Sequence, residues 1–201
     1  MGIRRALLFA SALALASCRW QLDGPPMVVE MPEVGAQVDV SGWHLQTEAR
    51  LSRNSKTEAG SKPSSTRFAK DTGWSSDMRF QAHKVPFPNV TIRRVAPINE
   101  HYKETKTLEA CAKSESEKQS STAITSWKLI SPPEKKKIGG VDVLELTNEV
   151  TVTGIDTALR TRWVFLAKDA YCYGIGAQTQ AAFWEKEQYL LNPVFDSIKP
   201  L

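Results

Sequence analysis

The three cysteines are the most informative reactive residues in this sequence, because a thiol can be acylated, oxidised to a disulfide or used as a nucleophile. They are Cys18, Cys111 and Cys172. Cys18 follows a short cationic head and an apolar stretch, residues 6–16, that ends in small residues. This layout is typical of a secretory signal, here residues 1–17. The stretch is well below the roughly 20 residues that span a bilayer.

Residues 15–18, Leu-Ala-Ser-Cys, resemble the lipobox of bacterial lipoproteins. The resemblance implies a diacylglyceryl thioether on Cys18, cleavage before it, and acylation of the new amino group with a chain such as palmitate. Several acyl chains anchor a protein stably, at about 0.8 kcal/mol per buried CH₂, whereas one holds it marginally. Arg19 follows, where Asp signals inner-membrane retention in enteric bacteria, so the resemblance implies an outer-membrane lipoprotein facing the periplasm. The alternatives are an ordinary secretory signal and a cytosolic chain with an apolar start.

Lipidation of Cys18 leaves Cys111 and Cys172 as the remaining thiols. In an oxidising compartment, two leftover cysteines favour one disulfide. The bridge closes a loop of roughly 60 residues and contributes about 3–4 kcal/mol to stability. Two buried, unpaired thiols are the alternative.

The common catalytic and metal-binding motifs do not occur in the sequence. His44, His83 and His101 are widely spaced, without a second ligand at a zinc-binding spacing. The nucleophile-elbow, phosphate-loop and dinucleotide-binding patterns are missing as well. Gly174 and Gly176 only partly match the last pattern, and close strand packing explains them better. We therefore expect no enzyme activity, no metal and no cofactor.

The charge balance argues against nucleic acid as a partner. The formal net charge of +4 falls to +2 once Arg4 and Arg5 leave with the signal. The remaining charges are mixed in sign, and aromatic residues do not interleave with cationic runs. Lysines 135–137 are a candidate contact for anionic lipid headgroups, with a charged hairpin turn as the alternative. Arginines 93, 94, 160 and 162 are candidates for a shared cationic patch.

The mature chain is long enough for one domain. Residues 18–32 contain Gly24, Pro25 and Pro26, which predicts a tether between the lipid and the folded body. Residues 33–201 are expected to form a single α+β domain, with a mobile loop at residues 52–65. Trp43 and Trp74 flank that loop, so they are candidate binding residues lining a groove, with core packing as the alternative.

Hydrophobic periodicity predicts the elements of this domain. Alternation of apolar and polar residues, typical of half-buried strands, occurs at residues 36–45, 89–95, 123–130, 141–152, 158–168 and 171–175. Short turns join the last three strands, as in an antiparallel meander. Two helices are expected, at residues 99–119 and 179–198, and Pro193 is expected to kink or split the second. Cys111 falls on the apolar stripe of the first helix.

The last third of the sequence resembles the PsbP-like fold, which is named for an extrinsic protein of photosystem II and occurs in many bacterial lipoproteins. The resemblance rests on a Gly-Val strand opening at 140–141, a Tyr-rich strand at 171–173 and the closing segment PVFDSIKP at 193–200. It covers residues 85–201. Position 198 is Ile where members have Phe. The resemblance implies an antiparallel sheet flanked by helices, an α/β/α sandwich.

These features together predict a lipid-anchored, non-enzymatic lipoprotein that acts as a binding or assembly module in the bacterial envelope. Its partners would be the membrane, through the lipid on Cys18, and an envelope protein. Two alternatives remain at this point: a carrier with an apolar pocket for a small ligand, and an envelope enzyme whose site is assembled from scattered residues. Function does not follow from the fold, so the site has to decide between them.

Overall fold

The structure is a computed structural model that describes residues 21–46, 65–67, 76–82, 87–95, 107–117, 123–169 and 171–201. The predicted signal segment, Cys18, Trp74 and almost all of the predicted mobile loop lie outside these ranges. Ser65, the last residue of that loop, begins a strand.

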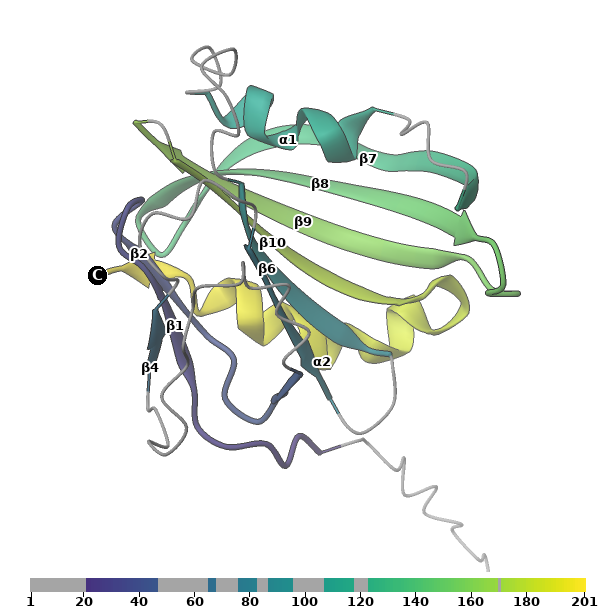
Figure 1. Cartoon of the computed structure of the whole chain (residues 1–201), viewed down its shortest axis with the longest axis horizontal. Helices are drawn as coiled ribbons and strands as arrows, with labels where there is room; N and C mark the ends of the chain where they lie inside the picture. Colours follow the sequence, from purple (N-terminus) through teal and green to yellow (C-terminus); the bar gives the residue numbers. More distant parts are fainter. Residues whose placement is uncertain are drawn as a thin grey trace, which may run out of the picture.

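An antiparallel sheet of seven strands forms the centre of the molecule, in the order β3-β5-β6-β10-β9-β8-β7 (Figure 1). The strands are β3 (His44–Gln46), β5 (Ser76–Gln81), β6 (Asn89–Val95), β7 (Ile124–Ile138), β8 (Val141–Val152), β9 (Leu159–Lys168) and β10 (Tyr171–Gln180). The predicted meander is present as β7 to β10, with each strand antiparallel to the next. Its turns use positive φ at Gly139, Gly140 and Gly154, which glycine adopts without a Cβ penalty.

Helix α1 (Leu108–Ser116) covers one face of this sheet, above β7 to β10. The Thr107 side chain caps it by accepting a hydrogen bond from the Ala110 amide at 3.2 Å. The helix ends at Ser116, before the predicted limit of residue 119, because Glu117 has an extended backbone. The predicted start, at residues 99–106, lies outside the described residues.

The opposite face of the large sheet packs against a second sheet and a second helix, as Figure 1 shows. The second sheet has the order β11-β2-β1-β4. Its strands are β1 (Val28–Met31), β2 (Ala36–Asp39), β4 (Ser65–Arg67) and β11 (Lys199–Pro200). Strand β1 corrects the predicted tether: Met27, Val29 and Met31 are buried, so the folded body begins before residue 33.

The second helix, α2 (Trp184–Asp196), follows a short 3-10 turn (Ala181–Phe183). It begins later than predicted, because Thr179 and Gln180 complete strand β10. Pro193 lies inside α2 and does not split it. Buried residues on both sides of the proline, Leu191 and Val194 among them, hold the last turn in place. This packing outweighs the one hydrogen bond that proline removes.

The fold is therefore mostly antiparallel β-sheet with few helices, and the predicted α/β/α sandwich is only partly correct. One outer layer is helix α1, whereas the other combines α2 with a four-stranded sheet. The larger core lies between the two sheets and α2, and a smaller one lies under α1. No helix in the described ranges is long and apolar enough to cross a membrane.

Candidate functional site

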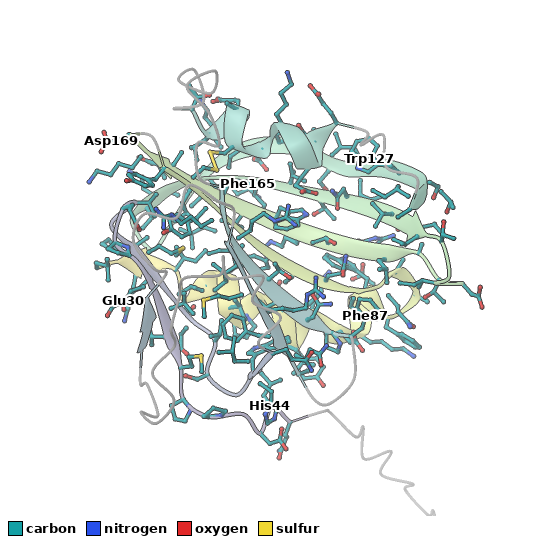
Figure 2. All side chains as sticks on the ribbon, in the orientation of Figure 1. Glu30, His44, Phe87, Trp127, Phe165 and Asp169 are labelled. Carbon is teal, nitrogen blue, oxygen red and sulfur yellow. A yellow bond between two sulfur atoms is a disulfide. The ribbon has the colours of Figure 1, made fainter. Side chains whose placement is uncertain are left out.

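A disulfide between Cys111 and Cys172 joins helix α1 to strand β10. Figure 2 shows it between the helix and the sheet, close to Phe165. The Cα atoms are 5.9 Å apart, and the two residues are 6% and 4% exposed. The predicted pairing of these cysteines is confirmed. Both thiols are consumed in the bridge and both residues are buried, so this pair supports structure rather than surface chemistry.

Polar contacts at both ends hold α1 against the sheet as well. Near its start, Glu109 forms an ion pair with Lys135 of β7 at 2.6 Å. A hydrogen bond from Lys135 is the main reason that the pKa of Glu109 lies below its ordinary value. Near its end, the Glu115 carboxylate binds Arg93 at 3.0 Å, and its backbone carbonyl accepts a hydrogen bond from Asn148 at 3.0 Å. Helix α1 is thus a fixed cover beside the outer strands.

Gly174 and Gly176 in β10 make room for aromatic rings beneath this cover, Gly174 for Phe165 and Gly176 for Trp163. A Cβ on Gly176 would lie 2.7 Å from the ring, closer than packed atoms approach. Trp163 also stacks on Phe165, with ring centroids 5.7 Å apart, and the Arg93 guanidinium lies 5.4 Å from its centroid. These glycines are therefore positions of close strand packing, as the sequence indicated, and Trp163 is a core residue.

Strand β7 is the outermost strand of the large sheet next to α1. Figure 2 places Trp127 on it, at the outer side of the molecule near α1. Trp127 and Leu129 are half-buried, and Lys128 between them is exposed. Because side chains alternate along a strand, Trp127 and Leu129 share the face that carries α1, and Lys128 points to the other face. This edge combines apolar and cationic groups beside exposed backbone, and we take it as the candidate functional site.

Lysines 135–137 do not form a free cationic cluster. Lys135 pairs with Glu109, Lys136 pairs with both Glu134 and Glu145, and Lys137 pairs with Asp142 at 3.3 Å. These carboxylates offset the positive charge that an anionic surface would attract. The structure favours the alternative interpretation, a charged hairpin.

The four arginines lie on two faces of the sheet. The register puts Arg93 on the face of α1, and arginines 94, 160 and 162 on the opposite face. Each has a carboxylate partner, as in the pairs of Arg160 with Glu149 at 2.8 Å and of Arg162 with Glu145 at 2.7 Å. The predicted shared cationic patch is therefore wrong, because neighbouring residues in a strand point to opposite faces.

A buried polar cluster that the sequence did not predict joins the two sheets. The Tyr173 hydroxyl donates a hydrogen bond to Glu33 at 2.7 Å, and Arg94 lies 3.5 Å from the same carboxylate. Burial first, and then the bond to Glu33, raises the pKa of Tyr173 well above its ordinary value. Glu33 is in the turn between β1 and β2, so its role depends on packing between segments 140 residues apart. No local sequence signal indicates such a pair.

Trp43, a predicted binding residue, is 1% exposed and belongs to the larger core. It offers almost no surface to a ligand, so core packing is the correct interpretation there. Trp74, the other predicted binding residue, lies outside the described residues, as does the lipidation candidate Cys18. The His44 imidazole forms a hydrogen bond with the Asp23 carboxylate at 2.8 Å. Within the described ranges, no group of His, Cys, Asp and Glu side chains is arranged to hold a metal ion.

Comparisons with known proteins found similar structures but no matching family. No protein-family model matches the sequence, and no curated protein matches it. The structure is similar to the solution structure of cyanobacterial PsbP (CyanoP) from Synechocystis, with a TM-score of 0.49 and 10% identity over 89% of this chain and 94% of that one. It is also similar to a crystal structure from Bacteroides thetaiotaomicron, with a TM-score of 0.44 and 12% identity. This chain spans 49% of that second protein.

The first neighbour carries the name of the group that the sequence resembles. Both TM-scores are below 0.5, however, and neither similarity assigns this chain to a family or gives it a function. The candidate site therefore has to be interpreted from its own residues.

Proposed function

We propose that this protein is a lipid-anchored binding or assembly module of the bacterial envelope, with no catalytic role of its own. The anchor is the lipid on Cys18, and the binding surface is the edge of the large sheet beside α1. Tethering confines the domain to a membrane and raises its effective concentration near partners on the same surface.

The observation that carries this proposal is the disulfide between Cys111 and Cys172. Disulfides persist in oxidising compartments such as the periplasm and are rare in the cytosol. A bridge of the two downstream cysteines thus supports export, which the apolar segment before Cys18 would direct. It also leaves Cys18 as the one cysteine outside the pair, in the position that a lipid attachment requires.

Replacement of the anchoring thiol tests the proposal. We predict that Cys18→Ala abolishes incorporation of an alkyne-tagged palmitate and leaves the precursor uncleaved, or releases the protein from the membrane fraction. The measurement is labelling of the full chain in its native envelope, followed by fractionation and an intact-mass spectrum. The double variant Cys111→Ala/Cys172→Ala is the matched control, since it removes two thiols and should keep the label. Unchanged lipid labelling of Cys18→Ala would refute the anchor.

The proposed outer-membrane location depends on Arg19, the residue that follows Cys18. By the sorting rule of enteric bacteria, Arg19→Asp should move the labelled protein from outer-membrane to inner-membrane fractions in an enteric host. Arg19→Lys is the control, because it keeps the charge and should stay with the outer membrane. Equal fractionation of both variants would remove the outer membrane from the proposal without affecting the lipid itself.

A further inference from the structure

The two halves of strand β7 differ in how their outer edge is protected. Residues 131–138 contain Pro132-Pro133 and three lysines, and two of the register shifts against β8 involve Ser131. Proline lacks an amide hydrogen, and lysines and bulges discourage pairing with a further strand. This half is built against strand addition.

Residues 126–129 have none of these features except one lysine. They pair in unbroken register with Thr151, Val150, Glu149 and Asn148 of β8. Within the described part of the chain, no strand lies outside β7 in the large sheet. Register shifts bound this short segment at both ends, and within it every second residue directs its backbone N–H and C=O groups away from β8. Trp127, on the face of α1, is half-buried. Such an edge is a template for an added strand.

Charge at this edge indicates what the added strand should contain. Lys128 is exposed, and its cross-strand neighbour Glu149 instead receives two hydrogen bonds from Arg160, at 3.0 and 2.8 Å. Among the described residues, Lys128 has no ion pair. On the opposite face, Trp127 and Leu129 offer apolar surface. An incoming strand would thus place an acidic side chain beside Lys128 and apolar side chains beside Trp127.

We propose that residues 126–129 bind an extended segment of a partner protein, in which acidic and apolar residues alternate, by adding it to the sheet as an eighth strand. This inference deepens the proposed binding function and rests on it. A second copy of the chain fits less well. Antiparallel pairing of two β7 edges would put both Lys128 side chains on one face of the joined sheet, and like charges on neighbouring strands destabilise the pair.

Two synthetic octapeptides test the proposal, one alternating valine with aspartate and one alternating valine with lysine, both with blocked ends. The protein is the full chain in detergent, and the measurements are peptide fluorescence anisotropy and hydrogen exchange. The aspartate peptide should slow exchange of the amides in residues 126–129 and bind about two- to fivefold more tightly than the lysine peptide, the range of one cross-strand charge pair. Lys128→Glu should reverse this order.

Lys186→Glu is the matched control, because it makes the same charge change on the exposed side of α2. Like the wild type, this variant should bind the aspartate peptide more tightly than the lysine peptide. A copy of the aspartate peptide N-methylated at alternate residues should bind weakly, since it lacks backbone donors. Three results would each overturn the proposal: protection outside β7, equal effects of the two lysine variants, or a concentration-dependent dimer that Trp127→Ala disrupts. Because β7 is present whether or not Cys18 carries a lipid, failure here is distinct from failure of the anchor.

Discussion

At the scale of single residues, glycines show how local geometry depends on distant neighbours. Gly139 and Gly140 form the turn between β7 and β8, and both have positive φ, of 54° and 90°. Their surroundings differ: a Cβ on Gly140 meets nothing within 4 Å, whereas a Cβ on Gly139 would collide with the backbone carbonyl of Ile198. The turn is thus packed against the C-terminal segment.

We predict that Gly139→Ala destabilises the protein by about 1–3 kcal/mol more than Gly140→Ala, because backbone on both sides has to shift to admit the methyl group. Gly140→Ala is the control, since it carries only the cost of positive φ, about 1–2 kcal/mol. Urea unfolding followed by circular dichroism gives both free energies. Equal losses for the two variants would show that the contact with Ile198 is not formed.

The Tyr173 hydroxyl gives a second prediction at this scale. Its pKa is raised in the folded state above the ordinary value of 10.0, so the folded state holds this proton more tightly than the unfolded state. Its stabilising contribution is complete below pH 10 and is lost as the pH rises above 10. We therefore expect the free energy of unfolding to fall between about pH 9 and pH 11 more steeply in the wild type than in Tyr173→Phe.

Urea unfolding at a series of pH values measures this difference. All other titrating groups contribute to both proteins, so their effects cancel when the two curves are compared. Tyr171→Phe is the matched control, since it removes the hydroxyl of a half-exposed tyrosine from the same strand, and it should follow the wild type. Parallel curves for wild type and Tyr173→Phe would contradict the prediction.

At the scale of elements, helix α1 depends on tertiary contacts. It has nine residues, below the roughly 12–15 that an isolated helix needs in water. The disulfide, the Glu109–Lys135 pair and the Glu115–Arg93 pair hold it on the sheet. Among these, the disulfide contributes most, because exposed ion pairs such as Glu109–Lys135 add little.

We predict that Cys111→Ala/Cys172→Ala loses about 4 kcal/mol of stability, from the chain entropy of a 61-residue separation. Thermal unfolding of the variant and the wild type gives the loss. As a second readout, a reductant should lower the Tm of the wild type and leave that of the double variant unchanged. A non-reducing peptide map with two free thiols in protein taken from the envelope would contradict the bridge itself.

At the scale of the whole molecule, the large antiparallel sheet is covered by helix α1 on one face and by α2 with the four-stranded sheet on the other. Among the described residues no strand pairs with the outer edge of β7, and the second sheet and α2 bury the face opposite α1 (Figure 1). Because the open edge is on the outermost strand, an added partner strand would extend the sheet without disturbing either core. This arrangement suits a module that binds through its edge.

Elements with clear periodicity could be predicted from the sequence alone. The apolar–polar alternation of β8 and β9 matches the two-residue period of a strand, and the apolar residues of α2 match the 3.6-residue period of a helix. Both periods come from local backbone geometry, so the sequence alone reveals them. Counting thiols also predicted the pair of Cys111 and Cys172, since only two cysteines remained once Cys18 was assigned to the lipid. Lipidation itself, and the envelope location that depends on it, stay predictions.

Only the tertiary structure decided which surfaces are buried and which side chains meet. The sequence left Trp43 open between a groove residue and a core residue, and it lies in the core because β1 and β2 pack over the large sheet. Arg93 and Arg94 are adjacent in the sequence, yet they lie on opposite faces of the sheet, and only Arg94 shares a face with Arg160 and Arg162. Sequence periodicity reports which face of an element is apolar. It carries no information on which distant element will cover that face, and that pairing decides whether the β7 edge stays open.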